Sequence, residues 1–144
     1  MKVLVSGDRH YTDSDNIGKV LKTLVGDSYP WSKSQHDEIQ IVIIHGSKGA
    51  GRLAGKWAIE LKYRNVEVST DRKVHGKEYG SILNQKILVE HQPELVLAFH
   101  SKLNKSRGTK DLVRQCLKLC PGTAIYNIWG KVELNQWILV RVEP

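Results

Sequence analysis

A glycine-rich segment directly follows one of the most apolar runs of the chain. It reads His45-Gly46-Ser47-Lys48-Gly49-Ala50-Gly51-Arg52, so three glycines fall within six residues where we expect a helix to begin. Backbone N–H groups that a helix leaves unpaired at its start, aided by the helix dipole, bind anions. The segment lacks the Gly-Lys-Ser/Thr ending of a Walker loop and the spacing of G-x-G-x-x-G. Taken alone, it indicates either an anion site or a tight turn.

A second glycine and a nearby cation end the first apolar run of the chain. The segment reads Ser6-Gly7-Asp8-Arg9-His10-Tyr11. Gly7 allows the chain to turn sharply and a ligand to approach the backbone closely. The guanidinium of Arg9 suits a phosphate group, although a surface salt bridge would explain the same residue.

A third such segment, Ser106-Arg107-Gly108-Thr109, lies just before a predicted helix. Thr109 can cap that helix with its side chain or offer its backbone N–H to a phosphate. Capping alone would explain Thr109. It would not explain why three predicted strands are each followed by glycine with Arg or Lys nearby.

Carboxylates near the strand ends are the candidate catalytic groups. Cleavage of a glycosidic bond needs a carboxylate that stabilises positive charge or activates water, and Asp8, Asp71 and Asp111 are suitably placed. His45 is a candidate ligand contact, but no second histidine stands at metal-ligand spacing from it. We therefore expect neither a metal ion nor a cofactor.

The elements that must position these residues alternate between strand and helix patterns. Predicted strands cover residues 2–6, 39–45, 66–70, 95–99, 123–128 and 136–142. Predicted helices cover residues 17–24, 51–63, 82–90 and 109–119, and the polar segment 27–37 is a predicted loop. This order is typical of an α/β fold, here a Rossmann-like and mainly parallel sheet flanked by helices on both faces. The last strand follows by a short connection, with a turn at residues 130–131, so we expect it to be an antiparallel edge strand.

Composition limits the class of protein. The 144 residues suit a single domain over residues 1–144, and the formal charge of +7 favours anionic partners. No apolar run reaches the roughly 20 residues that a membrane span needs. The apolar run at the start of the chain is also too short for the core of a signal peptide. We therefore expect a cytoplasmic protein with no membrane partner. Cys116 and Cys120 stand four apart in a predicted helix, where we expect buried thiols.

Taken together, the glycine-containing segments resemble the SLOG superfamily, and within it the small YspA-like proteins. The matching residues follow one another in order over about residues 1–127: Gly7, Arg9 and Tyr11; His45, Gly46, Gly49 and Ala50; His75, Gly76, Lys77, Gly80 and Asn84; and Phe99, Gly108 and Thr109. The resemblance implies a Rossmann-like fold that binds nucleotides or nucleotide-derived molecules, and makes a homo-oligomer plausible. Relatives include the LOG phosphoribohydrolases, which cleave nucleoside monophosphates, and DprA, which binds single-stranded DNA.

The resemblance and the residues together give the expected ligand contacts. These are Gly7, Arg9, Tyr11, His45, Gly46, Ser47, Lys48, Gly49, Asn84, Arg107, Gly108 and Thr109. The chain also departs from the family pattern, which commonly has Asp at the position of Gly51 and Arg at that of Leu83. The LOG pattern places its catalytic Glu at the position of Leu112, and a helix turns the neighbouring Asp111 about 100° away.

Three functions stay open on the sequence. The leading one is a protein that binds a phosphate-bearing nucleotide or nucleotide-derived small molecule, as a sensor or a sequestering module. The second is a hydrolase of nucleoside phosphates or ADP-ribose-like substrates. The third is a nucleic-acid-binding module. For the third, stacking candidates are Tyr11, Trp31 and Trp129, and the cations are Lys102, Lys105, Arg107, Lys110, Arg114 and Lys118.

Overall fold

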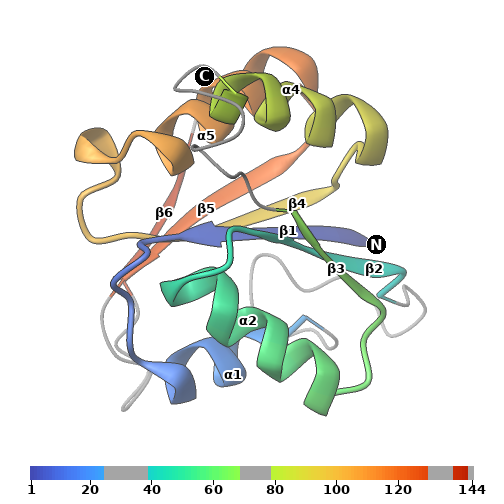
Figure 1. Cartoon of the computed structure of the whole chain (residues 1–144), viewed down its shortest axis with the longest axis vertical. Helices are drawn as coiled ribbons and strands as arrows, with labels where there is room; N and C mark the ends of the chain where they lie inside the picture. The colour runs from blue at the N-terminus through green and yellow to red at the C-terminus, as the bar shows by residue number, and fades with distance from the viewer. Residues whose placement is uncertain (25–38, 69–78, 130–137, 143–144) are drawn as a thin grey trace.

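The computed structural model of the chain describes residues 1–24, 39–68, 79–129 and 138–142. Figure 1 shows a central sheet between two layers of helices, with α1 and α2 on one face and α4 and α5 on the other. The predicted loop 27–37, the predicted turn 130–131 and the candidate Asp71 lie outside the described residues.

Six strands form the sheet in the order β3-β2-β1-β4-β5-β6. Their bounds are β1 Lys2–Gly7, β2 Ile41–His45, β3 Asn65–Val68, β4 Leu95–Phe99, β5 Ala124–Trp129 and β6 Ile138–Arg141. Strands β1 to β5 run parallel to one another. The short β6 lies at the edge and pairs with β5 in the antiparallel direction.

The strand order reverses at β1. The chain runs outward from β1 to β2 and β3, and then returns to place β4 on the other side of β1. This is the order of the doubly wound Rossmann fold, in which ligands bind beyond the carboxyl ends of the strands at the reversal. The topology therefore directs attention to the segments that follow β1, β2 and β4.

Apolar side chains on both faces explain why the central strands form. In β4 all five residues are buried, and in β2 the run Val42, Ile43 and Ile44 is buried. Alternate residues of a strand point to opposite faces, so one apolar run can supply two cores. Val42 and Ile44 pack in the core on the α1–α2 side, while Ile43 packs in the core on the α4–α5 side.

Four helices in the described residues cover the sheet: α1 Ser14–Lys22, α2 Gly49–Glu60, α4 Tyr79–His91 and α5 Gly108–Leu119. The carboxylate of Asp13 accepts a hydrogen bond from the backbone N–H of Asn16 and so caps the start of α1. The N-cap residues Lys48 of α2 and Arg107 of α5 make no such side-chain bond, although the Ser106 hydroxyl accepts from the backbone N–H of Thr109 in the first turn of α5. The starts of these two helices therefore keep N–H groups available.

The predicted helices and strands are confirmed, with shifts of a few residues at their ends. The strand Leu95–Phe99 has the predicted bounds, whereas the helix expected from residue 51 begins at Gly49. Cys116 and Cys120 are free, buried thiols, as predicted. Burial raises the pKa of the Cys116 thiol to about 12. No helix in the described part of the chain combines the length and apolarity that crossing a bilayer requires.

Candidate functional site

A cleft of about 690 Å³ lies at the carboxyl ends of β1, β2 and β4. Ten of the twelve predicted ligand contacts line it: Gly7, Arg9, His45, Gly46, Ser47, Lys48, Asn84, Arg107, Gly108 and Thr109. They come from segments that are far apart in the sequence, and the reversal of the strand order brings their backbones together.

The wall of the cleft carries a strong excess of positive charge. Among the described residues, Arg9, Lys48, Lys105 and Arg107 line it, against the single carboxylate of Asp8. The four cationic side chains are exposed, and no ion pair occupies them within the described residues. The alternative explanation of Arg9, a surface salt bridge, therefore finds no partner carboxylate among the described residues. Charges of one sign in a concave site concentrate ions of the other sign.

Two helices begin at this cleft from opposite faces of the sheet. Figure 1 shows the first turns of α2 and α5 on the same side of the molecule, one in each helical layer. The N-cap residues Lys48 and Arg107, and the first helical residue Gly108, all line the cleft. The backbone N–H groups of Gly49, Gly108 and Lys110 have no acceptor among the described residues. The N–H of Ala50 donates to the Asp8 carbonyl oxygen, and the N–H of Thr109, which the sequence offered as a phosphate donor, donates to the Ser106 hydroxyl. The cleft thus combines side-chain cations with the start of α5, where the Gly108 N–H is unpaired, and with the segment that leads into α2.

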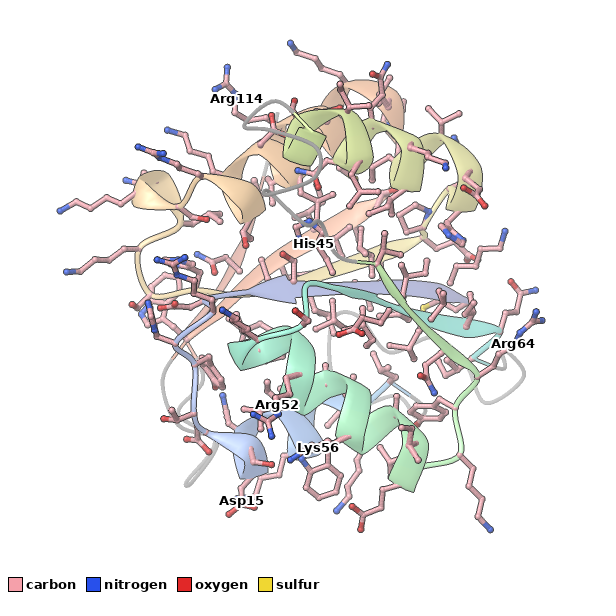
Figure 2. All side chains as sticks on the ribbon, in the orientation of Figure 1. Asp15, His45, Arg52, Lys56, Arg64 and Arg114 are labelled. Atoms are coloured by element: carbon pink, nitrogen blue, oxygen red, sulfur yellow. The ribbon has the colours of Figure 1, made fainter. Side chains whose placement is uncertain are left out.

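A hydrogen-bonded chain of side chains underlies the cleft. The Ser6 hydroxyl lies 2.7 Å from His45 Nδ1 and 3.0 Å from the Thr109 hydroxyl. His45 Nε2 lies 2.8 Å from Asn84 Oδ1. Figure 2 shows His45 between the sheet and the α4–α5 layer, which is where these partners come from. Burial lowers the pKa of His45, against the opposing effects of its hydrogen bond to Asn84 and of the charge of Asp111.

The candidate Asp111 is hydrogen-bonded to Asn84 of this row of side chains and does not line the cleft. Its Oδ2 accepts hydrogen bonds from Asn84 Nδ2 at 2.9 Å and from Gln115 Nε2 at 2.8 Å. The Ser81 hydroxyl lies 3.4 Å from its Oδ1. Of the candidate carboxylates that the structure describes, only Asp8 faces the cleft, where its Oδ1 accepts a hydrogen bond from the backbone N–H of His10.

Two of the predicted ligand contacts lie outside the cleft. The ring of Tyr11 packs edge-on against Phe99, with 5.8 Å between ring centroids, and its hydroxyl accepts a hydrogen bond from the Asn16 amide. Burial raises the pKa of Tyr11. Gly49 sits behind the cleft wall, in the left-handed region at φ +55°, where it packs against the backbone of Asp8 and Arg9. Both residues support the segment that carries Arg9.

The two departures from the SLOG pattern also have a structural setting. A Cβ atom on Gly51 would lie 2.6 Å from the carbonyl oxygen of Gly46, so this backbone has no room for a side chain there. Leu83 is buried and lines the cleft together with Val68. Where the pattern has an arginine, the cleft therefore has an apolar surface.

Several residues that line or support the cleft were not among the predicted contacts. Lys105, Ser106, His10 and His100 line it, and Ser6 supports it from below. Ser6 is a fully buried polar residue that directly follows the buried apolar run Val3–Val5 of β1. That contrast is a signal in the sequence, because buried hydroxyl groups require partners.

No cluster of three or more His, Cys, Asp or Glu residues within the described ranges is arranged to hold a metal ion. Comparisons of the chain with protein-family models, with curated proteins and with solved structures gave no match.

Proposed function

We propose that the protein binds a phosphate-bearing nucleotide or nucleotide-derived small molecule in the cleft, and that its resemblance to the SLOG superfamily reflects this function. One observation carries the proposal: the starts of α2 and α5 meet at one cleft where, among the described residues, side-chain cations outnumber carboxylates four to one. Free N–H groups at a helix start favour an anion, and arginine favours the planar oxygens of phosphate.

The rest of the lining suits the remainder of a nucleotide. Val68 and Leu83 give the cleft an apolar surface, and the rings of His10 and His100 lie in the same lining. Small-molecule sites combine such surfaces with a few polar groups that fix orientation. A ligand with one strongly anionic end and one flat, weakly polar end fits this division.

Binding without turnover is favoured over hydrolysis by the position of the carboxylates. Asp111 is occupied by Asn84 and Gln115 and does not face the cleft. Among the candidate carboxylates that the structure describes, only Asp8 lines the cleft, together with the cations that would bind phosphate. We therefore propose a sensor or a sequestering module; of the described candidates, Asp8 is the one through which the hydrolase alternative would act.

A thermal-shift panel tests the proposal. The full chain is heated with nucleoside mono-, di- and triphosphates, cyclic dinucleotides and ADP-ribose derivatives, and each phosphate-bearing compound is paired with its parent nucleoside. A ligand at about a hundred times its Kd stabilises the fold by about 2.7 kcal/mol, which raises the melting temperature by several degrees. We expect a shift with at least one phosphate-bearing compound and none with its nucleoside. Equal behaviour of the two, or no shift in the whole panel, contradicts the proposal.

The exposed cations of residues 102–118 favour nucleic acid as the second candidate. Lys102, Lys105, Arg107, Arg114 and Lys118 are exposed along α5 and the short helix η1, Leu103–Lys105, before it. A single-stranded oligonucleotide in the same panel addresses this candidate. Binding to such a row of cations weakens steeply with salt, whereas binding to the cleft by a short ligand depends on salt far less.

A further inference from the structure

Five polar side chains in and beneath the wall of the cleft form one continuous row of hydrogen bonds across four elements. Its members are Ser6 of β1, His45 of β2, Asn84 of α4, and Thr109 and Asp111 of α5. Ser6, Asn84 and Thr109 are 0 %, 2 % and 4 % exposed. Buried polar groups in a fully paired network hold one another in a unique arrangement.

The donors and acceptors along this row of hydrogen bonds follow from its end at Asp111. Asn84 Nδ2 lies 2.9 Å from the Asp111 carboxylate and 3.3 Å from the carbonyl oxygen of Gly108, and both of these groups only accept. The amide must therefore turn its Oδ1 to His45, 2.8 Å from Nε2. Because Oδ1 only accepts, the proton of His45 resides on Nε2.

The other ring nitrogen then acts as an acceptor. In the neutral ring, Nδ1 of His45 accepts from the Ser6 hydroxyl at 2.7 Å. The Ser6 oxygen is left to accept from the Thr109 hydroxyl at 3.0 Å, the shorter of the two contacts of that hydroxyl, whose other acceptor is the Gly7 carbonyl oxygen at 3.4 Å. Thr109 is the second residue of α5 and follows Gly108, whose unpaired N–H lies at the cleft. The series of hydrogen bonds that begins at the Asp111 carboxylate thus ends in the first turn of α5, at the proposed phosphate site.

We propose that Asp111 and Asn84 are positioning residues: they fix His45 as the neutral tautomer with its proton on Nε2, and through Ser6 and Thr109 they hold the first turn of α5 in the geometry that binds phosphate. This inference rests on the proposed function. Asp111 acts here as a hydrogen-bond acceptor, and its charge is not offered to the ligand, since it does not line the cleft.

The contacts of Asp111 provide a matched pair of variants. Its Oδ2 accepts from Asn84 and Gln115, while its Oδ1 lies beside the Ser81 hydroxyl. An asparagine can place its oxygen at the first position and donate from its nitrogen to Ser81 Oγ. Asp111→Asn therefore keeps the acceptor for Asn84 and Gln115 but removes the negative charge. Asp111→Leu removes the acceptor and replaces it with a side chain of nearly the same size.

The first test reads the tautomer of His45 in the ligand-free wild-type protein. Nitrogen-15 NMR with long-range correlation to the ring protons distinguishes a protonated from an unprotonated ring nitrogen. We expect Nε2 protonated and Nδ1 unprotonated at pH 7.5. A proton on Nδ1, whether or not Nε2 also carries one, overturns the inference. This reading needs no ligand, so it is independent of the proposed function and of the stability of any variant.

The second test titrates inorganic phosphate into each protein and follows the amide signals of the first turn of α5. We expect Asp111→Asn to bind within about twofold of the wild type and to keep the tautomer, and Asp111→Leu to bind at least about tenfold more weakly and to lose it. Gln115→Leu is the control, because Gln115 touches the same carboxylate and no other member of the chain; it should bind within about twofold. Equal losses in both Asp111 variants assign the effect to charge and overturn the inference, as does wild-type binding by Asp111→Leu. If the wild-type protein itself binds no phosphate, the proposed function fails instead.

Discussion

The double substitution Arg9→Gln/Arg107→Gln is expected to weaken binding of a phosphate-bearing nucleotide by at least about a hundredfold. Each guanidinium lines the cleft from a different segment, after β1 and at the start of α5. A hydrogen bond to a charged group contributes about 1.5–3 kcal/mol, and each 1.4 kcal/mol is tenfold in Kd. Two such losses correspond to about a hundredfold or more, measured by isothermal titration with the strongest ligand of the thermal-shift panel.

The control for this variant removes the same charge elsewhere. Figure 2 shows Arg64 and Arg114 at the outer surface, away from His45, and neither lines the cleft. The variant Arg64→Gln/Arg114→Gln should bind within about threefold of the wild type, because distant exposed charges are screened by salt. Since all four arginines are exposed, we expect no loss of stability in either variant. Equal weakening in both variants would mean that net charge, and not the cleft, governs binding.

Gly49→Ala is expected to lower the free energy of unfolding by about 2–5 kcal/mol, from left-handed strain of about 1–2 kcal/mol and overpacking of about 1–3 kcal/mol. The residue has a φ of +55°, and an added Cβ atom would overlap the carbonyl oxygen of Asp8 and the backbone of Arg9. Backbone atoms cannot move aside as a flexible side chain can. The loop that carries Arg9 must shift, so ligand affinity should fall together with stability. Urea denaturation of the ligand-free protein measures the first effect.

Gly55→Ala, in the same helix, is the matched control. Gly55 lies within α2, and a Cβ atom there would meet nothing within 4 Å. Alanine is favoured over glycine inside a helix by about 0.5–1 kcal/mol, so this variant should be slightly more stable than the wild type. If Gly49→Ala proves as stable as Gly55→Ala, the claim that α2 packs closely against the loop after β1 at Gly49 is wrong.

The sequence predicts the elements well because their signals are local. The strand Leu95–Phe99 is a short apolar run after a proline, and the apolar side chains of α5 recur at helical spacing. The glycine-containing segments likewise reveal the cleft, since the carboxyl ends of parallel strands must share one edge of the sheet. Most of the expected contacts line it for this reason.

The parts that the sequence does not predict depend on contacts between distant residues. Tyr11 follows Arg9 closely in the chain, yet its ring turns to Phe99 on the α1–α2 side of the sheet. The row of hydrogen-bonded side chains from Ser6 to Asp111 joins residues separated by up to 105 positions in the sequence. Only the placement of β1 between β2 and β4 brings these residues into contact. No spacing rule along the sequence contains that information.

An amide-resolved NMR titration with a nucleoside diphosphate tests the central claim most directly. The claim is that one ligand engages the starts of both α2 and α5. We expect the largest shifts at the N–H groups of residues 47–49 and 108–110, saturating together with a single Kd, and no comparable shifts at Arg64 or Arg114. Shifts confined to the exposed cations of residues 102–118, or a saturated complex in which neither helix start responds, would contradict the account.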